Sequence, residues 1–212
     1  MQTKYLFCLF TISIIFLTYS CNSAFTPKPK GYFRIDFPEH RYQTFDEPGF
    51  PYQFEYPSYA IVSKQSDSSG NQPYWLNLEF KDFSGKLYLS YKSIEGYSVY
   101  KVKSENGYKD SLAKNTFDQL RDEAFSMTYK HTIKASGIVD SFFMVRPGYA
   151  GMYFYVAGNA ATSKQFFVTD SVKHFLRGAL YFDATPNEDS VGVVSDFLDA
   201  DLKHLIRTLK WK

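Results

Sequence analysis

The chain has 212 residues and a formal net charge of +2, with 44% hydrophobic and 22% charged residues. This balance excludes a disordered chain and offers no electrostatic case for nucleic-acid binding. Phe and Tyr are abundant, at 21 and 18 residues, which favours strands and broad aromatic packing.

Residues 1–20 have the pattern of a signal peptide. Lys4 is the sole charge among them, and the apolar run Tyr5–Leu17 follows it. That length is typical of an h-region and is short of the ~20 apolar residues of a transmembrane helix. The alternative is an uncleaved membrane anchor, which polar Asn22 disfavours because it stops the apolar run. We predict cleavage before Cys21.

Cys21 is the predicted lipidation site. Ser20 is the small residue expected before a lipidated cysteine, although Thr18 stands where the usual motif has Leu, and Leu17 comes one step early. Each buried CH₂ is worth ~0.8 kcal/mol, so several acyl chains such as palmitate would hold the protein on a membrane. Cys8 lies within the signal, so the mature chain has one cysteine and no internal disulfide.

The mature chain divides into a tether and a folded region. Residues 21–30 are predicted to be the lipidated cysteine and a tether, because Asn22–Lys30 holds two prolines and two lysines and no acid. No later linker marks a second boundary, so residues 31–212 are predicted to form a single α+β domain.

The first clear strands form a predicted hairpin. Trp75–Phe80 and Lys86–Tyr91 alternate between apolar and polar residues, and the turn-forming run Asp82–Gly85 separates them. A shorter strand is expected at Tyr52–Tyr56.

A helix is predicted over Ser111–His131, with Asp110 as its N-cap. Its apolar stripe would consist of Ala113, Phe117, Leu120, Ala124 and Met127.

A second block of strands follows this helix and is predicted to be an antiparallel meander. Gly148–Gly151 is Gly-rich but lies between strand-like runs, which indicates a hairpin turn with close backbone contact. The expected strands are Ile138–Val145, Tyr149–Val156, Gln165–Thr169 and His174–Phe182.

The chain ends in a predicted helix. Thr185, Pro186 and Glu188 match a capping box with proline at the first helical position. The order strands, helix, strands, helix favours an α+β fold, in which two helices pack on an antiparallel sheet. A sandwich of the PsbP-like or Mog1-like kind has this order. The apolar face would consist of Val194, Phe197, Leu198, Leu202, Leu205, Ile206 and Leu209.

No constellation of catalytic or metal-binding residues stands out. His204 shares a helix with Asp201 and Asp199, but such residues are more often a solvated helix face than metal ligands. We therefore predict no metal, no cofactor and no catalytic residue, and leave the binding residues unknown. The four histidines, none at a common metal spacing, are His40, His131, His174 and His204.

Two aromatic stretches, Tyr52–Tyr56 and Tyr149–Tyr155, admit a sugar- or peptide-binding interpretation. Alternate rings of a strand face opposite sides, so at least half should be core, and we favour the core interpretation. An exposed aromatic face would most readily serve as a protein interface.

Several segments resemble the gliding motility lipoprotein GldD family of Bacteroidetes. They are PKPKGYFRIDFPEH (Pro27–His40), YWLNLEF with KLYLSY, RPGYAGMYFYVAGNAATSKQFFVTDS (Arg146–Ser171), HFLRGALYFDATPNEDS (His174–Ser190) and LIRTLKW. The resemblance implies a lipoprotein of the cell envelope that is required for gliding motility. In that system gliding is linked to type IX secretion, and the family is not known as an enzyme and carries over no catalytic residues.

Two hypotheses follow. The first is a non-enzymatic component or stabiliser of the gliding and type IX secretion machinery, whose partners are the membrane and proteins of that machinery. The second is a periplasmic protein that binds peptidoglycan or lipid; a hydrolase with a spatially assembled site is a distant third. Asn22–Ile35 contains no acid. In Bacteroidetes, acids after the lipidated cysteine favour surface export, so the domain is expected to face the periplasm, on the inner membrane or the inner leaflet of the outer membrane.

Overall fold

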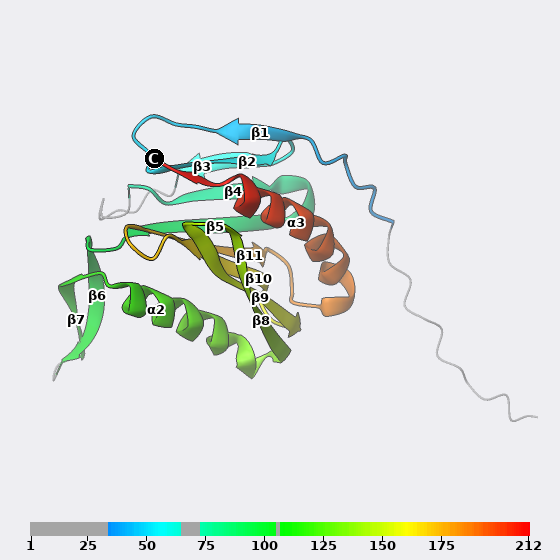
Figure 1. Ribbon diagram of the computed structural model, residues 1–212. Coiled ribbons are helices and arrows are strands. Elements are labelled where there is room, and N and C mark those ends of the chain that lie inside the picture. Colours follow the sequence, from blue (N-terminus) through cyan, green and yellow to red (C-terminus); the bar gives the residue numbers. More distant parts are fainter. Residues whose placement is uncertain (1–33, 65–72, 105–106) are drawn as a thin grey trace, which may run out of the picture. The chain divides into compact units, whose positions relative to one another are not determined.

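A seven-stranded antiparallel sheet lies at the centre of the computed structural model, which describes residues 34–64, 73–104 and 107–212 (Figure 1). The strands are β3 (Ile61–Lys64), β4 (Leu76–Phe80), β5 (Gly85–Ser93), β8 (Ala135–Arg146), β9 (Tyr149–Gly158), β10 (Thr162–Thr169) and β11 (His174–Phe182). Their order across the sheet is β3-β4-β5-β11-β10-β9-β8. Residues Asp36–Lys212 form one compact unit. The predicted signal peptide (1–20), Cys21 and the tether (21–30) lie outside the described residues.

Helix α3 and a small second sheet cover one face of the large sheet. The small sheet has the order β1-β2-β12. Leu198, Leu202 and Leu205 of α3 are at most 1% exposed and pack with alternate residues of the strands, which is the apolar face that the sequence predicted. The elements are α3 (Glu188–Thr208), β1 (Tyr42–Phe45), β2 (Tyr52–Pro57) and β12 (Lys210–Trp211).

Helix α2 (Phe117–Tyr129) packs on the opposite face and continues into the short 3₁₀ helix η2 (Lys130–Ile133) (Figure 1). Leu120 and Ala124 of α2 are buried in a second, smaller core. Their partners come from β9, β10 and β11 and from the residue that follows β5, so α2 covers part of this face. The strand residues and loop residue of this core are Ile94, Phe154, Phe167 and Phe175.

The predicted start of the first helix was wrong. Residues Gly107–Lys114 form strand β7, which pairs antiparallel with β6 (Tyr97–Ser104), so Asp110 and Ala113 are strand residues. The helix begins after Thr116, whose hydroxyl accepts from Gln119 N while the Gln119 side chain accepts from Thr116 N. This reciprocal capping box satisfies two free N–H groups at the helix start, which Asp110 does not do.

The predicted cap of the last helix was also displaced. Asn187, rather than Thr185, precedes α3, and its side chain accepts a hydrogen bond from Asp189 N. Asparagine is among the best N-cap residues, and it places Glu188 and Asp189 in the first turn, where the helix dipole favours acids.

The remaining predicted elements are confirmed. β4 and β5 form the expected hairpin, with the 3₁₀ helix η1 (Lys81–Phe83) in the connection. β8, β9, β10 and β11 are neighbours in chain order and antiparallel throughout. The fold is therefore α+β, with two helices on a mostly antiparallel framework. Within the described ranges, no helix has both the length and the apolar character needed to cross a membrane.

Candidate functional site

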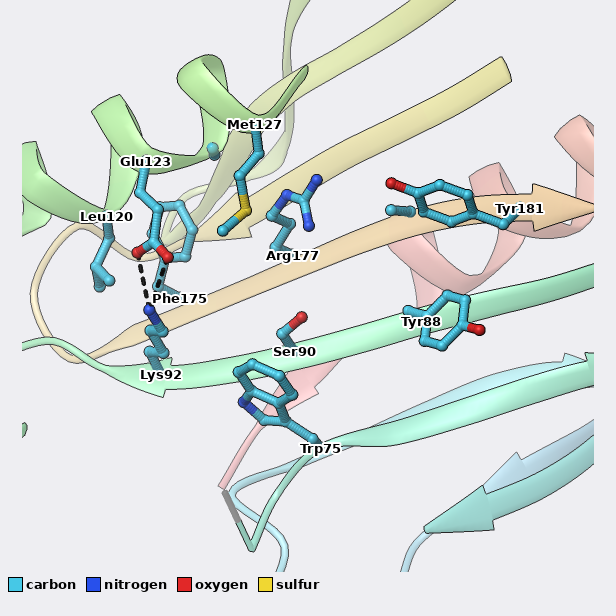
Figure 2. Close-up of a pocket in the computed structure, with 12 residues that line it drawn as sticks. Trp75, Tyr88, Ser90, Lys92, Leu120, Glu123, Met127, Phe175, Arg177 and Tyr181 are labelled. Atoms are coloured by element: carbon cyan, nitrogen blue, oxygen red, sulfur yellow. Dashed lines mark hydrogen bonds and ion pairs between the residues drawn. The ribbon is translucent and has the colours of Figure 1, made fainter. Parts of the chain in front are cut away.

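A pocket with a volume of about 470 Å³ opens between α2 and strands β5 and β11 (Figure 2). It lies on the face of the sheet that α2 covers only in part. Its walls are mostly carbon, with a few polar groups among them. The lining residues are Trp75, Tyr88, Ser90, Lys92, Leu120, Glu123, Ala124, Met127, Phe175, Arg177, Ala179 and Tyr181.

These side chains reach the pocket because successive residues of a strand point to opposite faces of the sheet. In β5, Leu87, Leu89 and Tyr91 enter the first core, so the intervening residues Tyr88, Ser90 and Lys92 face the other side. In β11, Leu176 and Leu180 enter the same core, and the odd-numbered residues from Phe175 to Tyr181 line the pocket on the opposite face. The antiparallel register places Arg177 directly opposite Ser90.

Arg177 is the central charged group of the pocket. Figure 2 shows it beside Met127, with Tyr88 and Tyr181 at one end and Lys92 and Glu123 at the other. Burial lowers the pKa of Arg177 from its ordinary value, although the group stays protonated. Among the described residues, no carboxylate forms an ion pair with Arg177.

The buried side-chain amide of Gln165 forms a hydrogen bond with Arg177. Gln165 Oε1 accepts hydrogen bonds from Arg177 Nη2 and, at 3.1 Å, from Thr128 Oγ1 of α2. Arg177 fixes the orientation of the amide, because the reversed amide would present an N–H group to a guanidinium that cannot accept; the Thr128 hydroxyl, which also lies 2.9 Å from Ala124 O, can donate or accept. In the described part of the chain, Gln165 Nε2 is buried without a hydrogen-bond partner, so this cluster has more donors than acceptors.

The second cation of the pocket is neutralised. Lys92 Nζ donates to Glu123 Oε2 at 2.8 Å and to Oε1 at 3.1 Å, which joins β5 to α2 (Figure 2). The two side chains are 14% and 28% exposed, so water screens the pair less than it would screen a surface pair. Lys92 also lies 5.0 Å from the ring centre of Tyr100 in β6.

Aromatic rings form the apolar walls. Trp75 Nε1 donates to Tyr91 O at 3.0 Å, so this indole offers the pocket its carbon surface rather than its N–H. Tyr88 and Tyr181 meet edge to face, with ring centres 5.7 Å apart. The hydroxyl of Tyr181 lies 3.5 Å from His131 Nε2. Burial first, and then the charge of Arg177, lowers the pKa of His131.

A separate polar cluster surrounds Asp201 on α3. Asp201 is 2% exposed, and its carboxylate accepts from His40 Nδ1 at 2.7 Å, from Tyr42 Oη at 3.1 Å and from Tyr59 Oη. Burial, followed by the charge of Asp201, raises the pKa of Tyr42 to about 12. Burial and the bond to Asp201 also raise the pKa of Tyr59. These contacts join α3 to residues on both sides of β2, and they leave the carboxylate with partners on both oxygens.

The residues considered as a metal pair are not brought together. His204 Nε2 forms a hydrogen bond with Glu55 Oε2 at 2.6 Å. Asp199 accepts a hydrogen bond from Tyr153 at 2.6 Å, and Asp201 accepts one from His40. Nowhere in residues 34–64, 73–104 and 107–212 do three or more His, Cys, Asp or Glu residues gather as metal ligands would. His174 is buried instead, and its ring stacks on Trp211.

The aromatic stretches are mainly core, as the alternation indicated. Tyr52 and Phe54 are at most 1% exposed, as is Phe154, whereas Tyr155 is 39% exposed. Of the Gly-rich run, Gly148 lies in the turn between β8 and β9 and has a φ of +78°, which an L residue adopts with strain, whereas the residues from Tyr149 to Gly151 belong to β9.

Sequence reasoning missed the pocket, although one signal was present. Arg177 is a single charge within the apolar run of β11. Burying an unpaired charge costs free energy, so a charge inside a buried strand indicates a binding partner or a functional role. Lys92 and Glu123 gave no signal, because their pairing depends on where α2 crosses the sheet.

The comparisons with known proteins support one family. The family model described as "Gliding motility lipoprotein GldD" matches residues 22–211. No curated protein matches the chain. Among solved structures, the chain is similar to the solution structure of cyanobacterial PsbP (CyanoP) from Synechocystis, with a TM-score of 0.45 and 11% identity over 88% of this chain and 100% of that chain.

Proposed function

The chain belongs to the gliding motility lipoprotein GldD family, and from that membership we propose that it is a non-enzymatic component or stabiliser of the gliding and type IX secretion machinery. The observation that carries the proposal is the family match over residues 22–211, which spans nearly the whole chain after Cys21. The family is not known as an enzyme. Its name links the chain to gliding and to the cell envelope, whereas the secretion partners are our inference.

The proposed attachment has three parts. Residues 1–20 are removed as a signal peptide, Cys21 carries the lipid, and residues 21–30 connect it to a single domain formed by residues 31–212. The domain faces the periplasm, because Asn22–Ile35 lacks the acids that favour surface export. Replacement of Cys21 by Ser should release the protein from membranes, as judged by fractionation and by metabolic labelling with an alkyne-tagged palmitate analogue.

A protein component of a machine needs a contact surface, and the β6–β7 hairpin offers one. Its register places Val99 opposite Leu112, on the same face as Tyr97 and Tyr108. These side chains are 41%, 68%, 68% and 77% exposed in that order. The charged residues Lys101, Lys103, Asp110 and Lys114 share this face, and exposed apolar and aromatic side chains among polar ones are typical of protein interaction sites.

The test is a mild crosslink in living cells, followed by recovery of a C-terminally tagged protein and identification of what is bound. Enrichment of gliding or secretion proteins over an unrelated periplasmic lipoprotein supports the proposal. The paired variant Tyr108→Ser with Leu112→Ser should reduce that enrichment. Ile133→Ser is the matched control, because Ile133 is 85% exposed and lies in η2, outside the hairpin. Recovery of no such protein by the wild type would refute the proposal.

A second candidate, a periplasmic protein that binds an envelope ligand, is favoured by the pocket beside α2. Its volume lies within the ~300–1,000 Å³ that is usual for small-molecule sites, and its apolar walls surround one charged group. Saturable binding of a small molecule in that pocket would support this candidate without affecting the first.

A further inference from the structure

The charges that line the pocket leave one cation unbalanced. Lys92 and Glu123 neutralise each other through two hydrogen bonds. Arg177 forms no ion pair in the described part of the chain; its polar neighbours Gln165 and Tyr181 are neutral, and the charge of Glu123, which also acts on it, is taken up by Lys92. The pocket therefore carries one net positive charge in a mostly apolar enclosure, which favours a singly charged anion.

From this arrangement we propose that the pocket binds a monocarboxylate whose carboxyl group meets Arg177 and whose apolar body lies against Trp75, Met127 and Phe175. The inference rests on the second candidate function above and is independent of the first.

The geometry of arginine favours a carboxylate. A guanidinium has five N–H donors in one plane, and Gln165 Oε1 takes up one of them. Two parallel N–H groups match the two oxygens of a carboxylate, and such charge-assisted bonds are about twice as strong as neutral ones. Ser90, directly across the strand pair from Arg177, adds a hydroxyl that can donate to the same group. A cation would be repelled, and a dianion would leave one charge without a partner.

The walls account for the apolar body. Trp75 has already used its N–H on Tyr91 O, and Phe175 and Ala179 offer carbon alone. Met127 of α2 is 37% exposed although it lies on the side of the helix that faces the sheet, because the pocket opens beneath it. A flexible thioether adapts to ligands of differing shape, so both aliphatic and aromatic bodies should be accepted.

The experiment uses the intact lipoprotein, purified from membranes and placed in lipid nanodiscs. The probes are octanoate and 4-phenylbutyrate, each compared with its neutral amide and with octyl phosphate. The readout is the fluorescence of Trp75, measured in a Trp211→Phe background because Trp211 lies outside the pocket. Both carboxylates should give saturable changes at millimolar concentration or below, and their amides should bind about tenfold more weakly or worse. Empty nanodiscs correct for partition into lipid.

Two variants locate the carboxyl group. Arg177→Gln should weaken both carboxylates about tenfold or more and weaken their amides less, because the amide carbonyl loses a hydrogen bond but no charge–charge attraction. Ser90→Leu keeps the arginine and fills the cavity, so it should weaken carboxylates and amides together. Thermal unfolding of each variant shows whether it folds, and if Arg177→Gln does not fold, Ser90→Leu and the comparison of amide with acid still decide the matter.

Three results would overturn the inference. They are no saturable binding of either carboxylate, equal affinity for acid and amide, or tighter binding of octyl phosphate than of octanoate. The first proposal is assayed separately by the crosslink. Loss of carboxylate binding in Arg177→Gln with unchanged recovery of partners would separate the two functions.

Discussion

His40 and Asp201 are 161 residues apart in the chain, and His40 Nδ1 donates to Asp201 Oδ1 at 2.7 Å. The carboxylate is 1% exposed in its side chain, whereas the imidazole is 34% exposed. A carboxyl group can be buried to this extent because several donors reach it, here His40, Tyr42 and Tyr59. The pair therefore joins the first described segment to the last helix.

Asp201→Asn should destabilise the domain. The change replaces a carboxylate that accepts three hydrogen bonds with an amide. The amide N–H groups then face donors and cannot accept from them. A loss of about 1–3 kcal/mol in the free energy of unfolding is expected, measured by urea denaturation. Asp122→Asn is the control, because Asp122 is 69% exposed in its side chain, and it should change the stability by less than ~0.5 kcal/mol. Equal effects of the two variants would contradict a structural role for Asp201.

Gly151→Ala should disrupt the sheet. A Cβ at this position would lie 1.8 Å from Phe167 O of the neighbouring strand β10, so the backbone must move. The expected cost is about 1–3 kcal/mol or more, seen as a lower melting temperature. Gly137→Ala is the matched control, since its added Cβ meets nothing within 4 Å. If Gly151→Ala melts at the wild-type temperature, β9 and β10 do not approach as described.

Stability should fall with acidification, and His174 should contribute to the fall. Burial lowers the pKa of His174 in the folded state. Below pH ~6.5 the histidine of the unfolded chain therefore binds a proton while that of the folded chain stays neutral, and this difference favours the unfolded state. The stabilising effect is complete above that pH and is lost as the pH drops towards the lowered pKa. The expected slope is up to ~1.4 kcal/mol per pH unit.

The slope can be assigned by substitution. His174→Asn should flatten the dependence of the unfolding free energy on pH, independently of any change it makes to the unfolding free energy at pH 8. The pKa of His131 is also lowered by burial, so His131→Asn should remove a further part of the slope. A His174→Asn profile parallel to that of the wild type would show that His174 does not titrate with folding.

Glu123→Gln should strengthen carboxylate binding in the pocket. In the wild-type protein Lys92 forms an ion pair with Glu123. The substitution removes the negative charge of that pair and raises the net charge of the pocket from one to two positive units. The affinity for octanoate should rise by at least a few-fold, and that for octanamide should not change. Titration of Trp75 fluorescence in the Trp211→Phe background measures both. A decrease in octanoate affinity would place the carboxyl group away from these cations.

Much of the fold could be predicted because it depends on local periodicity. The alternation in β4 and β5, the four-strand meander and the leucine stripe of α3 are all present as expected. The helix ends were less predictable. Asp110 and Thr185 are good cap residues in isolation, but Thr116 with Gln119 and Asn187 are the residues that cap the helices. Two neighbouring cap candidates differ by about 1 kcal/mol, which strand pairing of Gly107–Lys114 can override.

The sequence alone determined the family, through segments spread from Pro27 to Trp211, and the periodicity that makes the chain an α+β protein. Only the tertiary structure decided which polar residues meet. His204 and Asp201, three positions apart, have different partners, whereas Arg177, Lys92 and Glu123 share one pocket although they come from three elements. The reason is that the path of α2 across the sheet depends on the packing of Leu120 and Ala124, and not on any signal near the charged residues.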